Sequence, residues 1–261
     1  MKLLFWRKPR VPVLVLHGIL ARRAALNIEE YGRLIDRACA AATGAHLVLD
    51  IESPGGSPVQ SDLIASRIRQ RAGEHDVRVH AVIGEIGASG GYWLACAADR
   101  ILANPMSIVG SIGVVGGGFG FDVALARLGV QRRIYTAGAN KRRGDPFLPE
   151  RVEDVEFTRA LLEDLHLRFK DWVRTRRAGR LKAAEDVLFD GGYMLGARAL
   201  AVGLIDGFAD VDSLVRELGG TKAQAQRFRP RRRGLAARLP RLLLDAAGEA
   251  GAERHTPRLW L

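Results

Sequence analysis

A single serine lies between glycines at the point where an apolar run gives way to a helical pattern. The stretch is GEIGASGGYWLACAADRI, residues 84–101, and the serine is Ser89. A serine on a sharp turn after a strand is the arrangement of a nucleophile elbow, and GASGG fits its G-x-S-x-G pattern. The alternative is that Ser89 is only a small residue in a tight strand-to-helix connection. The residues available as its base decide between the two.

Histidine is the first candidate for that base. The strand VLVLHGI, which holds His17, resembles the strand and His-Gly of an α/β-hydrolase, whose triad would need an acidic residue and then a histidine on loops after Ser89. Only His166 and His255 follow the serine, the first within a predicted helix and the second in a basic tail. The other histidines precede it, which is the wrong order for that fold. A Ser-His-Asp triad is therefore poorly supported.

Lysine is the second candidate. It can serve as the base of a serine nucleophile when it is neutral, a form that burial or neighbouring cations favour. Lys141 differs from the other lysines because it follows a predicted strand and lies in a glycine-containing loop, YTAGANKRRGDPF, residues 135–147. Arg142 and Arg143 would favour its neutral form if they point inward. We expect such a lysine to be buried.

Short strands alternate with helices along the chain, which predicts βα units and a mainly parallel sheet with its active site beyond the carboxyl ends of the strands. Two glycine-rich turns, at 53–57 and 87–91, lie at such ends. The uncharged stretch 101–121 is interpreted as buried loop and strand, because its glycines and proline argue against a membrane span. The predicted strands cover 11–19, 46–51, 77–85, 100–103 and 131–136, and the predicted helices 27–43, 59–72, a segment ending at Ala98, and 150–177.

The composition fits a soluble globular protein. The chain has 261 residues, of which 48% are hydrophobic and 26% charged. Cys39 and Cys96 fall in predicted helices without metal-ligand spacing, which argues against a disulfide framework or a zinc site. The N-terminal residues have no secretory h-region, so we expect a cytoplasmic protein or one bound peripherally to the cytoplasmic membrane.

Four motifs in order resemble the signal peptide peptidase A family of bacterial Ser/Lys serine peptidases, which includes SppA- and SohB-like proteins. The motifs are SPGGSP (53–58), GASGGYWLACAADRI (87–101), SIVGSIGV (107–114) and YTAGANKRRGDPF (135–147). The likeness covers about residues 11–215 and includes DGGYMLGARALAVGLIDGFAD (190–210). It implies an α/β crotonase-like or Clp-protease-like fold of repeated ββα units with a mainly parallel sheet.

The resemblance also implies the roles of individual residues. Ser89 would be the nucleophile and Lys141 the general base, with Ser111 orienting the lysine amine. A backbone N–H of Gly55 or Gly56, together with that of Gly90, would form the oxyanion hole. No cofactor or metal is expected.

The family likeness implies a function of cleaving extended, largely apolar peptides such as signal-peptide remnants. Such a peptide would add as a strand along the uncharged segment 110–120. Two alternatives share the fold: a catalytically silent scaffold and a crotonase-type acyl-CoA enzyme. The presence of both Ser89 and Lys141 counts against them. The residues expected to line the peptide cleft are Ile112, Gly113, Val114, Val115 and Gly116.

The expected organisation is one peptidase domain, residues 1–220, followed by a basic tail, residues 221–261. From Arg227 onward nine arginines face three acidic residues, a net charge of +6 out of +11 for the chain. This tail is expected to pack on the assembly or lie on an anionic membrane, and no motif indicates specific nucleic-acid binding. The family implies a homo-oligomer with active sites near subunit boundaries. Whether Lys141 acts within its own chain or across such a boundary stays open.

Overall fold

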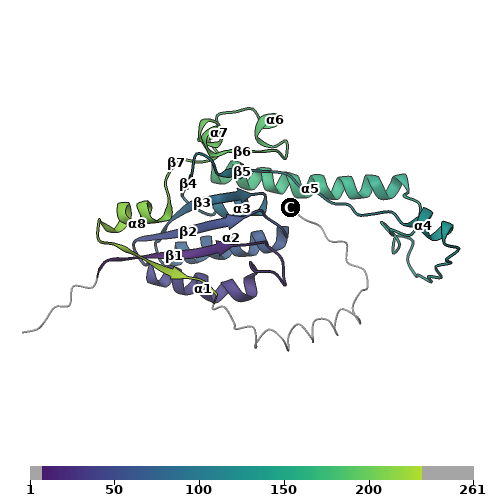
Figure 1. Cartoon of the computed structure of the whole chain (residues 1–261), viewed down its shortest axis with the longest axis horizontal. Coiled ribbons are helices and arrows are strands. Elements are labelled where there is room, and N and C mark those ends of the chain that lie inside the picture. Colours follow the sequence, from purple (N-terminus) through teal and green to yellow (C-terminus); the bar gives the residue numbers. More distant parts are fainter. Residues whose placement is uncertain (1–7, 231–261) are drawn as a thin grey trace, which may run out of the picture.

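An eight-stranded, mostly parallel sheet forms the centre of the protein (Figure 1). The computed structural model describes residues 8–230. The main strand order is β6-β5-β3-β2-β1-β8, with β4 on β3 and β7 on β4, and only β5 and β6 pair antiparallel. The strands are β1 (Arg10–His17), β2 (His46–Ser53), β3 (Arg78–Ala88), β4 (Arg100–Ala103), β5 (Ile108–Gly110), β6 (Tyr193–Leu195), β7 (Gly207–Phe208) and β8 (Gln224–Phe228).

The helices begin at capping signals that the sequence supplies. Asn27 accepts a hydrogen bond from the N–H of Glu30 at the start of α1, and Ser57 caps α2 ahead of a proline. Asp210 and Ser213 form a capping box at α8. The helices are α1 (Ile28–Ala41), α2 (Pro58–Glu74), α3 (Gly90–Ala95), α4 (Asp122–Arg127), α5 (Val152–Arg176), α6 (Glu185–Leu188), α7 (Gly196–Ala201) and α8 (Val211–Gly219).

The two faces of the sheet are covered by different helices. Leu47 and Leu49 of β2 belong to a large apolar cluster that includes buried residues of α1, α2, α3 and α5. Val48, between them, belongs to a second cluster with Leu214 of α8. This alternation follows from the two-residue period of a strand. The sheet is therefore the middle layer of a three-layer α/β domain.

Strand β3 places the candidate nucleophile, Ser89, at the edge of the sheet where the parallel strands end. Its first half pairs with β4 and its last residues pair with β5, so the two short strands extend along one long neighbour. The strand ends at Ala88, directly before Ser89. The glycine-rich turn 53–57 follows β2, the strand that pairs with β3 on its other side. The carboxyl ends of two adjacent parallel strands thus bring both predicted turns together.

One segment projects away from the domain. We call residues 117–151 the arm; it contains α4 and extends beyond the sheet from the N-terminal end of α5 (Figure 1).

The strand predicted over 131–136 is wrong, because the structure forms no strand there. A lone strand would leave its N–H and C=O groups unpaired, and no other described strand lies beside this part of the chain. The burial predicted for 101–121 holds for Ile112 but is wrong for Phe119, whose side chain is 81% exposed.

The C-terminal end of the domain includes β8, which pairs in parallel with β1. The boundary suggested at residue 220 falls before this strand, so the sheet extends to Phe228. The remainder of the basic tail, from residue 231, lies outside the described residues. No helix within residues 8–230 is long and apolar enough to cross a membrane.

Candidate active site

Ser89 occupies a strained turn between β3 and α3. Its φ and ψ are 54° and −123°, a conformation that residues with a side chain rarely adopt. Its N–H donates to the carbonyl of Gly110 at 2.8 Å, and its own carbonyl accepts from the N–H of Trp93 at 3.0 Å. The residue is 5% exposed, and its Oγ has no hydrogen-bond partner within residues 8–230. A buried hydroxyl normally has a partner, so this one is free for another group.

The PGG turn packs directly against this serine. A Cβ built on Gly55 would lie 2.8 Å from the Cβ of Ser89 and 3.0 Å from its Oγ. A Cβ on Gly90 would lie 2.5 Å from the Oγ of Ser61. Only glycine fits at either position, so the two backbone segments approach each other without side chains between them.

The backbone donors around Ser89 differ in their availability. The N–H of Gly55 donates to the Oγ of Ser53 at 3.2 Å. The N–H groups of Gly56 and Gly90 have no acceptor among the residues that the structure describes. Gly90 is the first residue of α3, where a helix leaves its N–H groups unpaired. Of the three predicted oxyanion-hole donors, those of Gly56 and Gly90 therefore remain free among the described residues.

The next motif, SIVGSIGV, lies on the other side of Ser89. Gly110, whose carbonyl holds the N–H of Ser89, is followed by Ser111 with a φ of 52°. The N–H of Ser111 donates to the carbonyl of Gly192 at 2.7 Å. The structure therefore brings together Ser89, Gly55, Gly90 and the Gly110–Ser111 turn.

Lys141 is not brought to this cluster within one chain. It lies on the arm, is exposed, and its amine makes no hydrogen bond or ion pair with residues 8–230. Arg142 and Arg143, which the sequence suggested as neighbours that favour a neutral lysine, are engaged elsewhere. Arg142 pairs with Asp145 at 3.4 Å, and Arg143 with Asp154 at 3.2 Å. The expected burial of Lys141 is wrong for the single subunit.

Helix α5 holds α3 against the domain. The indole Nε1 of Trp172 donates to the carbonyl of Trp93 at 3.0 Å, and the two rings stack with centroids 5.7 Å apart. Phe169 packs on the same Trp93 ring at 5.1 Å. Farther along, Arg176 donates to the carbonyl of Cys96 at 2.8 Å, at the C-terminal end of α3. Helix α5 therefore contacts α3, the helix that begins directly after Ser89, at several points.

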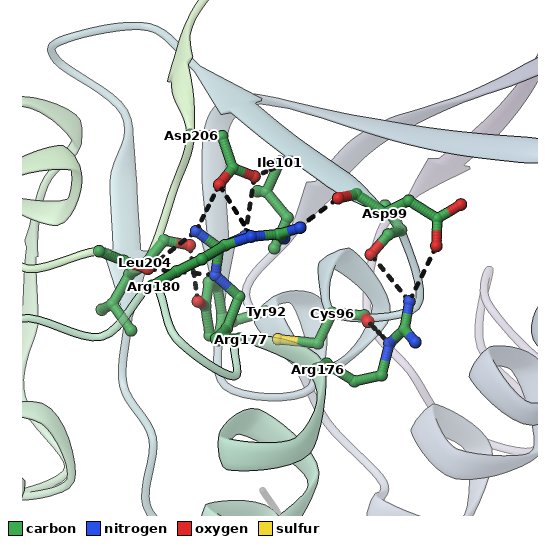
Figure 2. Close-up of polar contacts among 11 residues, drawn as sticks. Tyr92, Cys96, Asp99, Ile101, Arg176, Arg177, Arg180, Leu204 and Asp206 are labelled. Carbon is green, nitrogen blue, oxygen red and sulfur yellow. Dashed lines mark hydrogen bonds and ion pairs between the residues drawn. The ribbon is translucent and has the colours of Figure 1, made fainter.

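A buried ion pair completes this contact (Figure 2). Arg177, which is 1% exposed, donates from two nitrogens to the carboxylate of Asp206, each at 2.8 Å. The hydroxyl of Tyr92 donates to the carbonyl of Leu204 at 2.7 Å, so the segment GLIDG, residues 203–207, is hydrogen-bonded to α3 as well. Burial raises the pKa of the Cys96 thiol to about 12, so this cysteine is not a competing nucleophile.

An apolar cleft of about 480 Å³ lies between α2 and α5, and Trp93 forms part of its wall. The N–H of Trp93 bonds to the carbonyl of Ser89, and Pro58 follows the PGG turn closely, so the cleft lies beside the candidate nucleophile. The lining residues are Pro58, Val59, Asp62, Leu63, Trp93, Leu161, Asp164, Leu165 and Arg168.

Sequence patterns missed one residue at this site. His166 was assigned only to the middle of a helix, whereas its Nε2 lies 3.0 Å from the carbonyl oxygen of Ile112, in the predicted peptide-binding segment. The two residues are 54 positions apart, and the helical period of α5 indicates only which face is apolar. Nothing local to His166 indicates this partner.

Comparison with known proteins connects this geometry to a family. The family model described as peptidase family S49 matches residues 71–225. Over 248 residues the chain is 42% identical to a Brucella melitensis protein named Na(+)/H(+) antiporter NhaA, covering 93% of this chain and 34% of that protein. It is 32% identical over 176 residues to the "Probable protease SohB" of Buchnera aphidicola, covering 67% of this chain and 56% of that one. The chain thus spans only part of each relative.

The fold agrees with a solved structure. The 1510-N membrane-bound stomatin-specific protease superposes with a TM-score of 0.52 at 15% identity, over 86% of this chain and 99% of that one. The predicted crotonase-like or Clp-protease-like fold is confirmed. Because the family model covers more than half of the chain and SohB- and SppA-like proteins are among its relatives, this protein belongs to peptidase family S49.

Proposed function

We propose that this S49 peptidase is a serine endopeptidase with Ser89 as nucleophile and Lys141 as general base. The observation that carries the proposal is the state of Ser89: its buried Oγ has no hydrogen-bond partner among residues 8–230, and the residue occupies a strained turn at the carboxyl end of β3. A histidine base is not supported, because the histidine rings within residues 8–230 are engaged with other groups: His17 with Asp50, His46 with His80, His75 with Thr43 and His166 with Ile112.

The chemistry follows from the groups around the serine. The Oγ of Ser89 attacks the scissile carbonyl carbon while its proton passes to the neutral amine of Lys141. The resulting oxyanion accepts hydrogen bonds from the N–H of Gly90 and of Gly56 or Gly55, of which Gly56 has the free donor. The C–N bond then breaks as the protonated lysine gives its proton to the leaving amine. The neutral amine of Lys141 next takes a proton from water, whose oxygen attacks the acyl carbon, and a proton returns to the Oγ of Ser89 as the ester bond of the acyl-enzyme breaks. Ser111 is proposed to orient the lysine amine.

We propose further that Lys141 reaches Ser89 of a neighbouring copy. The arm that carries the lysine leaves large apolar side chains in solvent, including Tyr135 at 93% and Phe119 at 81% exposure. Phe119 contacts Phe121, which in turn contacts Phe147, and all three are exposed. A contiguous exposed apolar patch marks a protein-protein interface. Packing of the arm on a second copy would bury these side chains and the lysine together, which favours the neutral amine that the reaction requires. The proposal is a homo-oligomer with active sites at subunit boundaries.

The substrates that we propose are extended, largely apolar peptides, for example signal-peptide remnants. The apolar cleft beside Trp93 offers space for an apolar side chain near the scissile bond. The segment that includes Ile112, Gly113, Val114, Val115 and Gly116 would pair with the peptide backbone. A crotonase-type acyl-CoA enzyme or a silent scaffold would have no use for the serine and lysine together.

Such substrates are found at membranes, and the basic tail offers a means of reaching them. Each arginine near an anionic surface contributes about 1 kcal/mol. The relative named as a Na(+)/H(+) antiporter, in which the matching region is 34% of the protein, is consistent with a place near membranes. We propose peripheral membrane contact through residues 227–261. A liposome-sedimentation comparison of the full chain with a chain that ends at residue 230, beyond β8, tests it.

Active-site labelling and subunit mixing test the catalytic proposal. Wild-type protein should react with a fluorophosphonate probe at Ser89, and Ser89→Ala and Lys141→Ala should each abolish peptide cleavage. Mixing the two inactive variants under conditions that exchange subunits should restore part of the activity, because one copy then supplies the serine and the other the lysine. Lys222→Ala, which removes another exposed lysine, is the matched control and should remain active.

The outcomes separate the parts of the proposal. A wild-type protein that is not labelled at Ser89 would overturn the serine peptidase mechanism. Near wild-type turnover by Lys141→Ala would overturn the lysine assignment alone. A mixture that stays inactive despite proven exchange of subunits would show that the lysine does not act across the boundary.

A further inference from the structure

His166 of α5 contacts the segment that follows β5. Its Nε2 lies 3.0 Å from the carbonyl oxygen of Ile112, and a carbonyl only accepts hydrogen bonds, so this nitrogen carries the proton and donates. The histidine is half-buried, whereas the Ile112 side chain is fully buried. The contact therefore joins the middle of a long helix to a specific backbone group near the site.

The backbone of residues 110–112 is hydrogen-bonded to three different parts of the domain. The carbonyl of Gly110 accepts from the N–H of Ser89, the N–H of Ser111 donates to Gly192, and the carbonyl of Ile112 accepts from His166. The first bond joins the segment to the nucleophile and the last joins it to α5. After Ile112 the chain continues toward the arm.

The peptide unit between Ile112 and Gly113 is held at both of its polar groups, because the N–H of Gly113 donates to the carbonyl of Ser111 at 3.0 Å and the carbonyl of Ile112 accepts from His166. A Cβ on Gly113 would lie 2.8 Å from the Cα of Gly191, so packing requires glycine at this position. Glycine leaves the backbone conformationally permissive. A hydrogen bond to the carbonyl of that same peptide unit limits its rotation and commits this oxygen to α5. The groups left for a substrate strand are then those of the residues beyond it.

We infer that His166 is a positioning residue for peptide binding: it holds the backbone segment along which the substrate adds as a strand. The inference rests on the proposed function of Ser89 and deepens it by naming a residue that affects substrate binding without taking part in the chemistry. His166 does not contact Ser89, so its loss should affect peptides that use the segment and not small reagents that react with the serine alone.

The test compares two variants at this position. His166→Phe keeps a ring but removes the donor, and should raise the KM for an apolar peptide about fivefold, the effect of one lost hydrogen bond, with kcat changed less than about twofold. His166→Gln restores a side-chain N–H and should return the KM to within about twofold of wild type. The rate of fluorophosphonate labelling at Ser89 should be unchanged in both. His75→Phe is the matched control. His75 follows the C-terminal end of α2, and within residues 8–230 its ring bonds only to the hydroxyl of Thr43.

Each contrary result has a definite meaning. An unchanged KM in His166→Phe, or a Gln variant as impaired as the Phe variant, overturns the positioning role. Slower labelling in His166→Phe, in step with its loss of peptide cleavage, shows a general structural role and also overturns it. A wild-type protein without labelling at Ser89 overturns the proposed function first and this inference with it.

Discussion

Gly55 lies against Ser89 so closely that no side chain fits between them. The Cβ that alanine would add at position 55 would lie 2.8 Å from the Cβ of Ser89 and 2.8 Å from the backbone nitrogen of Gly90. Both neighbours belong to the strained turn that presents the nucleophile. The PGG motif and the GASGG motif, more than thirty residues apart, are therefore two halves of one backbone arrangement.

This contact predicts that Gly55→Ala displaces the serine or the oxyanion-hole donors. We expect fluorophosphonate labelling at Ser89 to fall by about a hundredfold or more, since the loss of one preorganised donor alone costs about 3 kcal/mol of transition-state stabilisation. Gly44→Ala is the control, because Gly44 also has a positive φ but has open space around its Cβ position. Equal labelling of the two variants would contradict a direct steric effect at the site.

The cleft beside Trp93 predicts a change in substrate preference. Leu63→Trp places a larger side chain in the cleft, so kcat/KM for peptides with a large apolar residue should fall about tenfold while labelling of Ser89 persists. Leu167→Trp is the control, since both leucines are 42% exposed but Leu167 does not line the cleft. If both variants cleave a set of peptides that differ in apolar side-chain size with the same preference, the cleft is not a side-chain subsite.

The buried ion pair of Figure 2 predicts a large effect on stability. Arg177→Met leaves the Asp206 carboxylate without its bidentate partner, and removing one member of a buried pair costs about 3 kcal/mol or more. Arg174→Met, three residues earlier on α5, breaks an exposed pair with Glu185 and should cost less than about 1 kcal/mol. Urea unfolding at neutral pH measures both losses. Similar losses in the two variants would show that burial of the pair is not the decisive factor.

The paired histidines at the opposite end of the sheet predict acid sensitivity. Burial, with repulsion from His46 and Arg100, lowers the pKa of His80 to about 4 from its ordinary value of 6.5. The imidazole of His80 therefore binds a proton more readily in the unfolded chain, where its pKa is about 6.5, than in the folded protein. As the pH falls from about 6.5 toward 4, this difference lowers the free energy of unfolding. Between pH 7 and pH 5 this group accounts for about 2 kcal/mol of lost unfolding free energy. His80→Gln, which cannot titrate, should lose correspondingly less over the same range in unfolding experiments.

The sequence alone was sufficient for the features that depend on neighbouring residues. The alternation of strands and helices predicted β1, β2 and β3 and the helix α5 within a few residues, because hydrophobic period and capping are local properties. The order of the glycine-rich motifs indicated the family. The placement of Ser89 between a strand and a helix followed from the apolar run before it and the helical spacing after it.

Tertiary structure decided what depends on distant contacts. In the described part of the chain it left the Oγ of Ser89 without a hydrogen-bond partner, set Gly55 against it, and connected His166 to Ile112 across 54 positions. It also left Lys141 exposed on the arm, and it formed no strand over residues 131–136, where the sequence analysis predicted one. A strand needs a neighbour to satisfy its N–H and C=O groups, and a neutral lysine needs a surface that removes it from water. Both needs are met by contacts between distant parts of a chain or between chains, which local sequence patterns do not specify.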